Sequence, residues 1–157
     1  MAIRTIVKIG DQLLREKSRE VEVFDERLGQ LLDDMAETME KEQGAGLAAV
    51  QVGILKRAAV IKTGNILYEI INPVIIKSEG SMNDSEGCLS IPGQKGELER
   101  PRTVVVRARD RKGQLKEFTV HEFTARAFCH EIDHMDGILF TDKIKPPEKK
   151  GLFKRKG

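Results

Sequence analysis

The feature that most constrains the fold is a segment near the end of the chain, from about Thr119 or Glu122 to Asp136. Its residues recur at helical spacing and are small or apolar on nearly every side, and Gly137 predicts where the helix ends. A helix without a continuous polar face has no side to turn toward water. We therefore predict a helix surrounded by protein, opened by a capping box between Thr119 and Glu122.

This helix carries the motif His-Glu-Ile-Asp-His, with imidazoles at His130 and His134. Residues four apart share one face of a helix, so both rings can reach one metal ion. Glu131 is rotated by about 100° from His130, where its carboxylate can hold a proton of a water molecule. Two buried imidazoles one turn apart need a polar partner. The motif therefore predicts a metal site.

A catalytic mononuclear site needs a third protein ligand and an open position. The 23 residues after His134 contain neither histidine nor cysteine. Cys88, in Glu-Gly-Cys-Leu-Ser-Ile-Pro, is the best remaining candidate, because a thiolate is a stronger donor than a carboxylate. A buried inert thiol is the alternative for Cys88. We expect His121 at the start of the helix and Cys129 in the core.

The remaining pattern indicates one α+β domain over residues 1–145. Apolar residues at helical spacing predict an amphipathic helix from Asp25 to Gln43. Strand-forming residues are enriched over 58–61, 67–76, 103–108 and 116–120. A turn at 110–113 predicts that the last two strands form a hairpin, and Pro73 and Pro101 suggest strand starts or edges.

Composition excludes several classes of protein. The net charge of +2 is too small to indicate nucleic acid as a specific ligand. No apolar run approaches the ~20 residues of a membrane span, and no signal peptide is evident. Two cysteines do not make a disulfide framework, so we expect a reducing cytoplasm. The basic tail, residues 146–157, is either a solvated segment or a weak phosphate contact.

The segment Gly44-Ala-Gly-Leu-Ala-Ala-Val-Gln51 contains two glycines and three alanines. Such small residues suit a place where another backbone or a substrate lies close. A phosphate-binding loop would end in Lys-Ser/Thr, which this segment lacks. A tight turn with close packing is the simpler interpretation, and the amide of Gln51 is suited to an oxyanion.

Three motifs now stand in order along the chain: GAGLAAVQ, EGCLSIP and HEIDH. Together they closely resemble the peptide deformylases, which remove the formyl group from the initiator methionine of new bacterial proteins. The resemblance runs from about Val7 to Ile144. Relatives usually carry a larger aliphatic residue at the position of Ala45, which lines their methionine pocket, so the resemblance does not fix the shape of that pocket here.

The resemblance implies a role for each motif residue. Cys88, His130 and His134 would hold one divalent ion, usually Fe(II), replaceable by nickel, cobalt or zinc. Glu131 would be the general base and acid, and Gln51 and the backbone N–H of Leu89 would face the oxyanion. The residues implied to bind the substrate are Gly44, Ala45, Gly46, Gly87 and Arg100.

The family fold is α+β, with antiparallel sheets packed around the HExxH helix. In the implied reaction, metal-activated water attacks the formyl carbon, and Glu131 passes its proton to the leaving amine with release of formate. The implied partners are N-formylmethionyl nascent peptides, and the basic tail would make a transient ribosome contact. We expect a monomer that binds no membrane.

Three other functions compete with this one. A zinc endopeptidase shares HExxH, but the missing downstream ligand and the EGCLSIP motif argue against it. A structural zinc site normally has four protein ligands, and only three good ones exist here. An RNA-binding function would rest only on the short basic tail.

Overall fold

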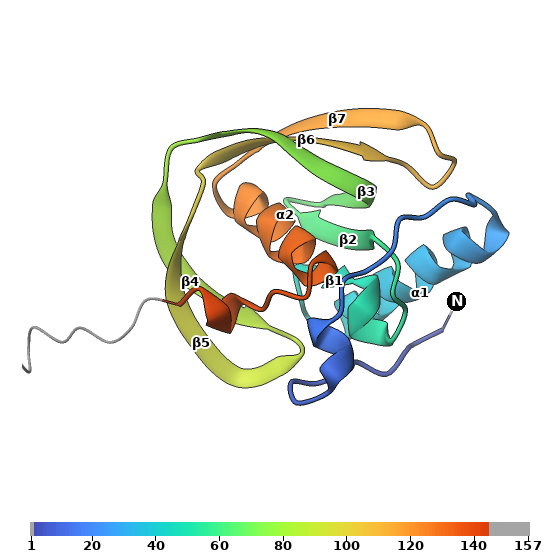
Figure 1. Cartoon of the computed structure of the whole chain (residues 1–157), viewed down its shortest axis with the longest axis horizontal. Coiled ribbons are helices and arrows are strands. Elements are labelled where there is room, and N and C mark those ends of the chain that lie inside the picture. The colour runs from blue at the N-terminus through green and yellow to red at the C-terminus, as the bar shows by residue number, and fades with distance from the viewer. Residues whose placement is uncertain (1, 145–157) are drawn as a thin grey trace, which may run out of the picture.

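The computed structural model describes residues 2–144, which contain two α-helices and a set of antiparallel strands (Figure 1). The helices are α1 (Glu26–Lys41) and α2 (Glu122–Met135). The strands are β1 (Gly46–Ala48), β2 (Ala58–Thr63), β3 (Ile66–Glu79), β4 (Met82–Cys88), β5 (Ile91–Arg100), β6 (Thr103–Arg109) and β7 (Leu115–His121). Short 3-10 helices cover η1 (Gln12–Arg15), η2 (Ala49–Val52) and η3 (Phe140–Asp142).

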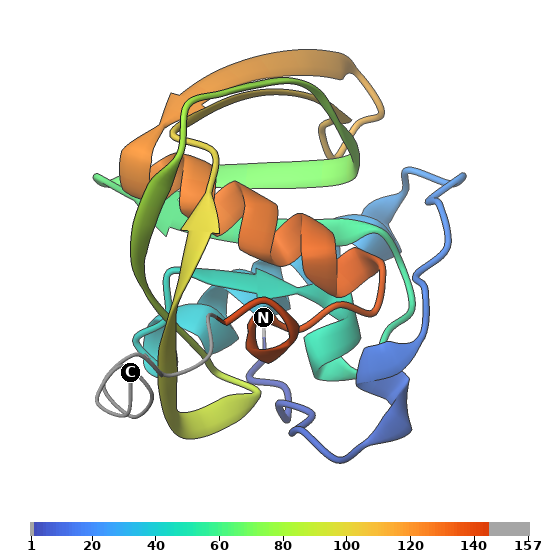
Figure 2. The same cartoon turned by 60° about the vertical axis from the view of Figure 1, so that its left-hand side comes forward.

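The strands form two antiparallel sheets around α2. One sheet has the order β1-β2-β3-β6-β7, and the other is the β4–β5 hairpin. Figure 2 shows α2 crossing the molecule between β1 and β2 on one side and β3, β6 and β7 on the other. The β4–β5 hairpin passes across the same helix. This is the α+β arrangement that the sequence predicts.

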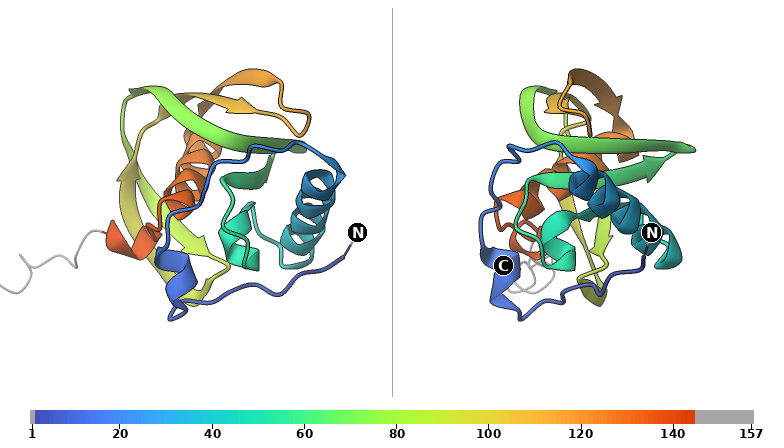
Figure 3. Two further views of the ribbon diagram at one scale, coloured as in Figure 1. Left: turned by 45° about the vertical axis from the view of Figure 1, so that its right-hand side comes forward. Right: turned by 90° about the vertical axis from the view of Figure 1, so that its right-hand side faces the viewer.

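Strand β2 separates the two halves of the core. Ala59 and Ile61 point toward the cluster that contains the α2 residues, whereas Ala58 and Val60 point toward the cluster that contains the α1 residues. Successive side chains of a strand face opposite sides of a sheet, so a strand covered on both faces is apolar throughout. Figure 3 shows α1 on the side of β1 and β2 that faces away from α2.

Helix α1 follows the predicted pattern closely. The side chain of Asp25 accepts a hydrogen bond from the backbone N–H of Leu28 at 3.1 Å, which caps the first turn. Its core face buries Leu28, Leu32 and Met35 among other residues. The helix ends at Lys41, and the N–H of Gly44 bonds to the carbonyl of Met39 at 2.9 Å.

Helix α2 begins at Glu122, so the predicted capping box is wrong. Thr119 lies in β7, where it is paired with Val105 of β6, and the N-cap is His121, whose side chain makes no capping bond. Thr119, which the local sequence pattern assigned to the start of the helix, is therefore part of a strand. Gly137 follows the helix with a φ of 75°, as predicted.

The four predicted strands are present, but β1, β4 and β5 were not predicted. The hairpin turn also forms, with Gly113 donating to the carbonyl of Asp110 at 2.9 Å. Pro73 lies inside β3, not at its start or at a sheet edge, and the register with β6 shifts between Ile71 and Val74. A bulge interrupts the regular hydrogen bonds of the ladder, so a strand that is paired on both edges can hold a proline there.

No helix in the described part of the chain is long and apolar enough to cross a membrane. The predicted basic tail, residues 146–157, lies outside the described residues.

Candidate metal centre

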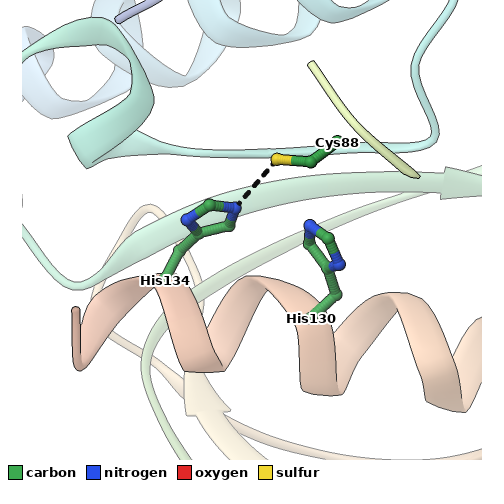
Figure 4. Close-up of side chains that lie close together, drawn as sticks. All are labelled: Cys88, His130 and His134. Carbon is green, nitrogen blue, oxygen red and sulfur yellow. Dashed lines mark hydrogen bonds between the residues drawn. The ribbon is translucent and has the colours of Figure 1, made fainter. Parts of the chain in front are cut away.

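Three side chains that could hold a metal ion converge at the end of the β4–β5 hairpin. His130 and His134 project from one face of α2 toward Cys88, the last residue of β4 (Figure 4). The Sγ of Cys88 lies 3.3 Å from Nε2 of His134. Ligand atoms of the three residues all lie within 4.8 Å of one another. One ion could therefore contact all three.

The donor set fits a divalent transition metal. His130 uses Nδ1 to contact a carboxylate oxygen of Glu86 at 2.8 Å, which leaves Nε2 for an ion. Nδ1 of His134 is buried and has no hydrogen-bond partner among the described residues. One thiol and two imidazoles are ligands that iron(II), zinc, nickel and cobalt accept, whereas magnesium and calcium prefer oxygen.

The two imidazoles differ in proton affinity. Burial disfavours the charged form of His130, but hydrogen bonds to the Cys88 thiol and to Glu86 outweigh burial and raise its pKa to about 10. Burial, together with the charge of His130, lowers the pKa of His134 well below its ordinary value. A metal ion must displace the proton from His130, so its affinity should rise with pH.

Glu86 lies at the centre of a buried ionic network. Its carboxylate accepts hydrogen bonds from Nε and Nη2 of Arg100 at 2.8 and 3.0 Å, and from Nη1 of Arg126 at 2.7 Å. Burial alone would raise the pKa of Glu86, but hydrogen bonds from His130 and Arg100 outweigh it and lower that pKa. The ionised carboxylate fixes the ring of His130, as carboxylates behind metal-binding histidines commonly do.

Arg100 occupies a different place from the one expected. Its side chain is buried, and its remaining nitrogen, Nη1, donates to Asp133 at 2.6 Å. Arg100 is not among the described residues that line the cavity beside the metal ligands. Arg100 therefore holds the carboxylate of Glu86, and its expected contact with substrate stays a prediction.

Glu131 is buried beside the metal ligands, and its Oε1 has no partner among the described residues. Burial raises its pKa to about 7.

A Cβ at Gly46 would lie 2.5 Å from Oε2 of Glu131, and one at Gly44 would lie 2.7 Å from Cδ1 of Leu89. A side chain at either glycine would therefore displace Glu131 or Leu89. At Gly87 a Cβ would meet protein atoms only at 3.6 Å or more. Packing within the protein therefore does not explain this glycine, and the space beside it is available to a ligand.

Gln51 reaches the same place from η2. Its Oε1 accepts a hydrogen bond from the N–H of Ala48 at 2.9 Å. Its Nε2 lies 3.1 Å from Oγ of Ser90 and 3.5 Å from Sγ of Cys88. The carboxamide is thereby held with one N–H directed to Ser90 and the other to Cys88.

A cavity of about 940 Å³ opens onto these groups. The sequence-predicted residues that line it are Gly44, Ala45, Gly46, Gln51, Gly87, Cys88, Leu89, His130 and Glu131. Ile6, Ile91, Phe123 and Ala127 add apolar surface. The cavity is large enough for a peptide terminus with an apolar side chain.

Comparison with known proteins agrees with this geometry. The family model described as polypeptide deformylase matches residues 3–150. The chain belongs to this family. A peptide deformylase of Alkaliphilus metalliredigens is 57% identical over 144 residues, which cover 92% of this chain and 98% of the relative. A second peptide deformylase, from Acetivibrio thermocellus, is 56% identical over 144 residues, covering 92% and 85%.

Solved structures of deformylases also match. The peptide deformylase of Thermotoga maritima superposes with a TM-score of 0.91 at 37% identity, covering 93% of this chain and 100% of that one. The Legionella pneumophila structure gives 0.89 at 41% identity, covering 99% and 93%. Deformylases are metal-dependent enzymes that remove the N-formyl group from the initiator methionine. The predicted family, fold and enzyme class are confirmed.

Three polar residues that support the candidate site received no role from the sequence: Glu86, Ser90 and Arg126. Glu86 and Ser90 flank Cys88 within one motif. A carboxylate two residues from a ligand candidate was a usable signal for a partner of a histidine. Arg126 gave no signal, because its partner Glu86 lies 40 residues earlier in the chain.

Proposed function

We propose that this chain deformylates N-formylmethionyl nascent peptides with one divalent ion held by Cys88, His130 and His134. We propose Fe(II) as the ion in the cell, with nickel, cobalt or zinc able to replace it. The thiol and the two imidazoles support this assignment, because such donors select transition metals. When bound, the ion would lower the pKa of a water molecule and polarise the formyl carbonyl.

Glu131 is the proposed general base and acid. The observation that carries this role is its carboxylate, buried beside the three ligands with one oxygen that lacks a partner among the described residues. A pKa of about 7 allows the carboxylate to accept the proton of the attacking water and to return it to the leaving amine near neutral pH.

Gln51 and the N–H of Leu89 are the proposed oxyanion donors. Negative charge develops on the formyl oxygen during attack, and each oriented donor of this kind typically contributes ~10²–10³ in rate. Nε2 of Gln51 lies beside Cys88, and Leu89 directly follows it in the chain. Both donors therefore lie next to a metal ligand.

The substrate main chain is proposed to lie between β1 and β4. In the described sheets, β1 is the end strand of one sheet and β4 pairs only with β5, so both have an unpaired edge. An extended peptide can add to such an edge through main-chain hydrogen bonds. Gly46 of β1 and Gly87 of β4 both line the cavity, as do Gly44 and Ala45.

The remaining assignments extend beyond the described residues. We propose a single catalytic domain over residues 1–145, acting as a monomer in the cytoplasm. The basic tail at 146–157 is proposed to contact the ribosome, from which the substrates emerge. Salt-sensitive co-sedimentation with ribosomes that disappears on deletion of 149–157 supports this contact, and unchanged co-sedimentation opposes it.

Selectivity for the formyl group tests the proposed function. A formyl carbon carries hydrogen where an acetyl carbon carries methyl, and the Glu131 side chain lies directly against Gly46 at the site. The nickel-loaded protein should release formate from N-formyl-Met-Ala-Ser about 10²-fold faster than acetate from the N-acetyl peptide. Equal rates would remove the proposed basis of selectivity.

A further inference from the structure

We infer that Ser90 is a positioning residue that orients the carboxamide of Gln51 for the reaction. This inference rests on the proposed role of Gln51 as an oxyanion donor. Ser90 is completely buried and lies in the turn between β4 and β5, two residues after Cys88. Its hydroxyl oxygen is 3.1 Å from Nε2 of Gln51.

The carboxamide of Gln51 has two chemically different ends, and each has its own partner. Oε1 accepts from the N–H of Ala48, which is the first residue before η2. Nε2 has two hydrogens; Ser90 accepts one of them, and the other is directed to the side of Cys88. With one hydrogen held by Ser90, the second points to Sγ of Cys88, beside the place proposed for the formyl oxygen.

The backbone around Ser90 is held independently of its hydroxyl. The N–H of Val7 donates to the carbonyl of Gln51 at 2.7 Å, and the N–H of Ile9 donates to the carbonyl of Ser90 at 2.8 Å. The segment 7–9 thus joins η2 to the β4–β5 turn through main-chain bonds. Removing the Ser90 hydroxyl should therefore leave the two backbones in place and free only the rotation of the carboxamide.

A double-mutant cycle separates this role from a merely structural one. In the nickel-loaded protein, Gln51→Ala should lower kcat by about 10²–10³. Ser90→Ala should lower kcat by about tenfold, the equivalent of one misdirected hydrogen bond, with KM and metal content unchanged. In the Gln51→Ala background, Ser90→Ala should change kcat by less than about twofold.

Ser90→Thr serves as the matched variant, because it keeps the hydroxyl while adding a methyl group to a packed site. Its kcat should stay within about threefold of the wild type, a change far smaller than the loss of a donor. The inference is overturned if Ser90→Ala lowers kcat equally in both backgrounds, or if it leaves the wild-type kcat unchanged.

A spectroscopic measurement keeps the inference separate from the proposed function. In the ¹⁵N spectrum of the zinc-loaded protein, the side-chain amide of Gln51 should give two distinct, slowly exchanging protons, and Ser90→Ala should abolish that protection. If Gln51→Ala leaves kcat unchanged, the oxyanion role of Gln51 fails, and this spectrum alone decides whether Ser90 orients the carboxamide. An amide that keeps its protection in Ser90→Ala would overturn the inference.

Discussion

The two helices of this protein are buried in different ways. Helix α1 lies on the outside of the sheet and buries one face, which consists mainly of leucine and methionine. Helix α2 lies between the sheets and buries every residue from Ala125 to Ile132, including Arg126, His130 and Glu131. Helix α1 thus packs through one mainly apolar face, whereas α2 combines apolar contacts with a set of buried, largely paired ionisable groups.

A central helix such as α2 has to bury ionisable side chains together with its apolar ones. Ionisable groups taken out of water must be paired or change their protonation. Arg126 and His130 are paired with Glu86, whereas one carboxylate oxygen of Glu131 has no partner within residues 2–144 and the pKa of Glu131 is raised. Glu131 is the group that we propose to move protons.

The largest effect on stability should come from the network behind α2. Glu86→Gln keeps the shape but leaves Arg100 and Arg126 buried without their ionised partner, so the free energy of unfolding should fall by about 3–5 kcal/mol. Metal affinity should fall by about 10–100-fold because the His130 ring loses its anchor. Urea unfolding and chelator competition measure the two effects.

Glu97→Gln is the matched control, since Glu97 is an exposed carboxylate on β5. Its free energy of unfolding should change by less than about 0.5 kcal/mol. A Glu86→Gln protein as stable as this control would show that the network does not support α2.

On the other helix, Leu32→Ala should affect stability alone. Leu32 is fully buried in the α1 cluster, so the substitution should cost about 3 kcal/mol of unfolding free energy. The kcat and the metal content of the folded protein should match the wild type. A lower kcat at unchanged stability would mean that α1 is coupled to the site. The two helices would then no longer differ in their effect on catalysis.

Glu131 should make the metal-free protein less stable as pH rises. Its pKa is about 7 in the folded protein against an ordinary 4.5, so the unfolded chain ionises first and the folded state is penalised above pH 4.5. The full penalty is reached above pH 7. Glu131→Gln removes this penalty. The free energy of unfolding of the variant, relative to that of the wild type, should therefore rise by about 2 kcal/mol between pH 5 and pH 8. Urea unfolding at both pH values measures the gain, and a difference independent of pH would contradict it.

The smallest effect is expected at the start of α1. Asp25→Ala removes the capping bond to Leu28 and should cost about 1 kcal/mol, a fall in Tm of roughly 2–4 °C. Activity at 25 °C should not change. An unaltered Tm in a calorimetric scan would show that packing alone sets this end of the helix.

The sequence predicts α1 nearly to its ends because the pattern and the cap are local. The sequence signal for the two histidines of α2 is equally local, since helical spacing alone places His130 and His134 on one face. Of the two predicted starts of α2, Glu122 is confirmed, but the capping box was mispredicted because Thr119 pairs with β6, a contact that no local pattern encodes.

Strands β4 and β5 escaped prediction because they lack apolar alternation. Their buried side chains include Glu86 and Arg100, whose partners are each other and residues of α2. Arg100 lies 14 residues from Glu86 along the chain, and Arg126 lies 40 residues away. Pairing of this kind becomes visible only when the sheets are folded around the helix.

We propose that the buried helix α2 presents Glu131 as the base of a metal-dependent deformylase. Formate release from N-formyl-Met-Ala-Ser should be measured for the wild type and Glu131→Gln, each purified without oxygen and loaded with one Fe(II) or Ni(II). We predict rapid release by the wild type and a rate about 10²–10⁴-fold lower for a variant that still holds its metal. A Glu131→Gln protein that releases formate at the wild-type rate would contradict the account.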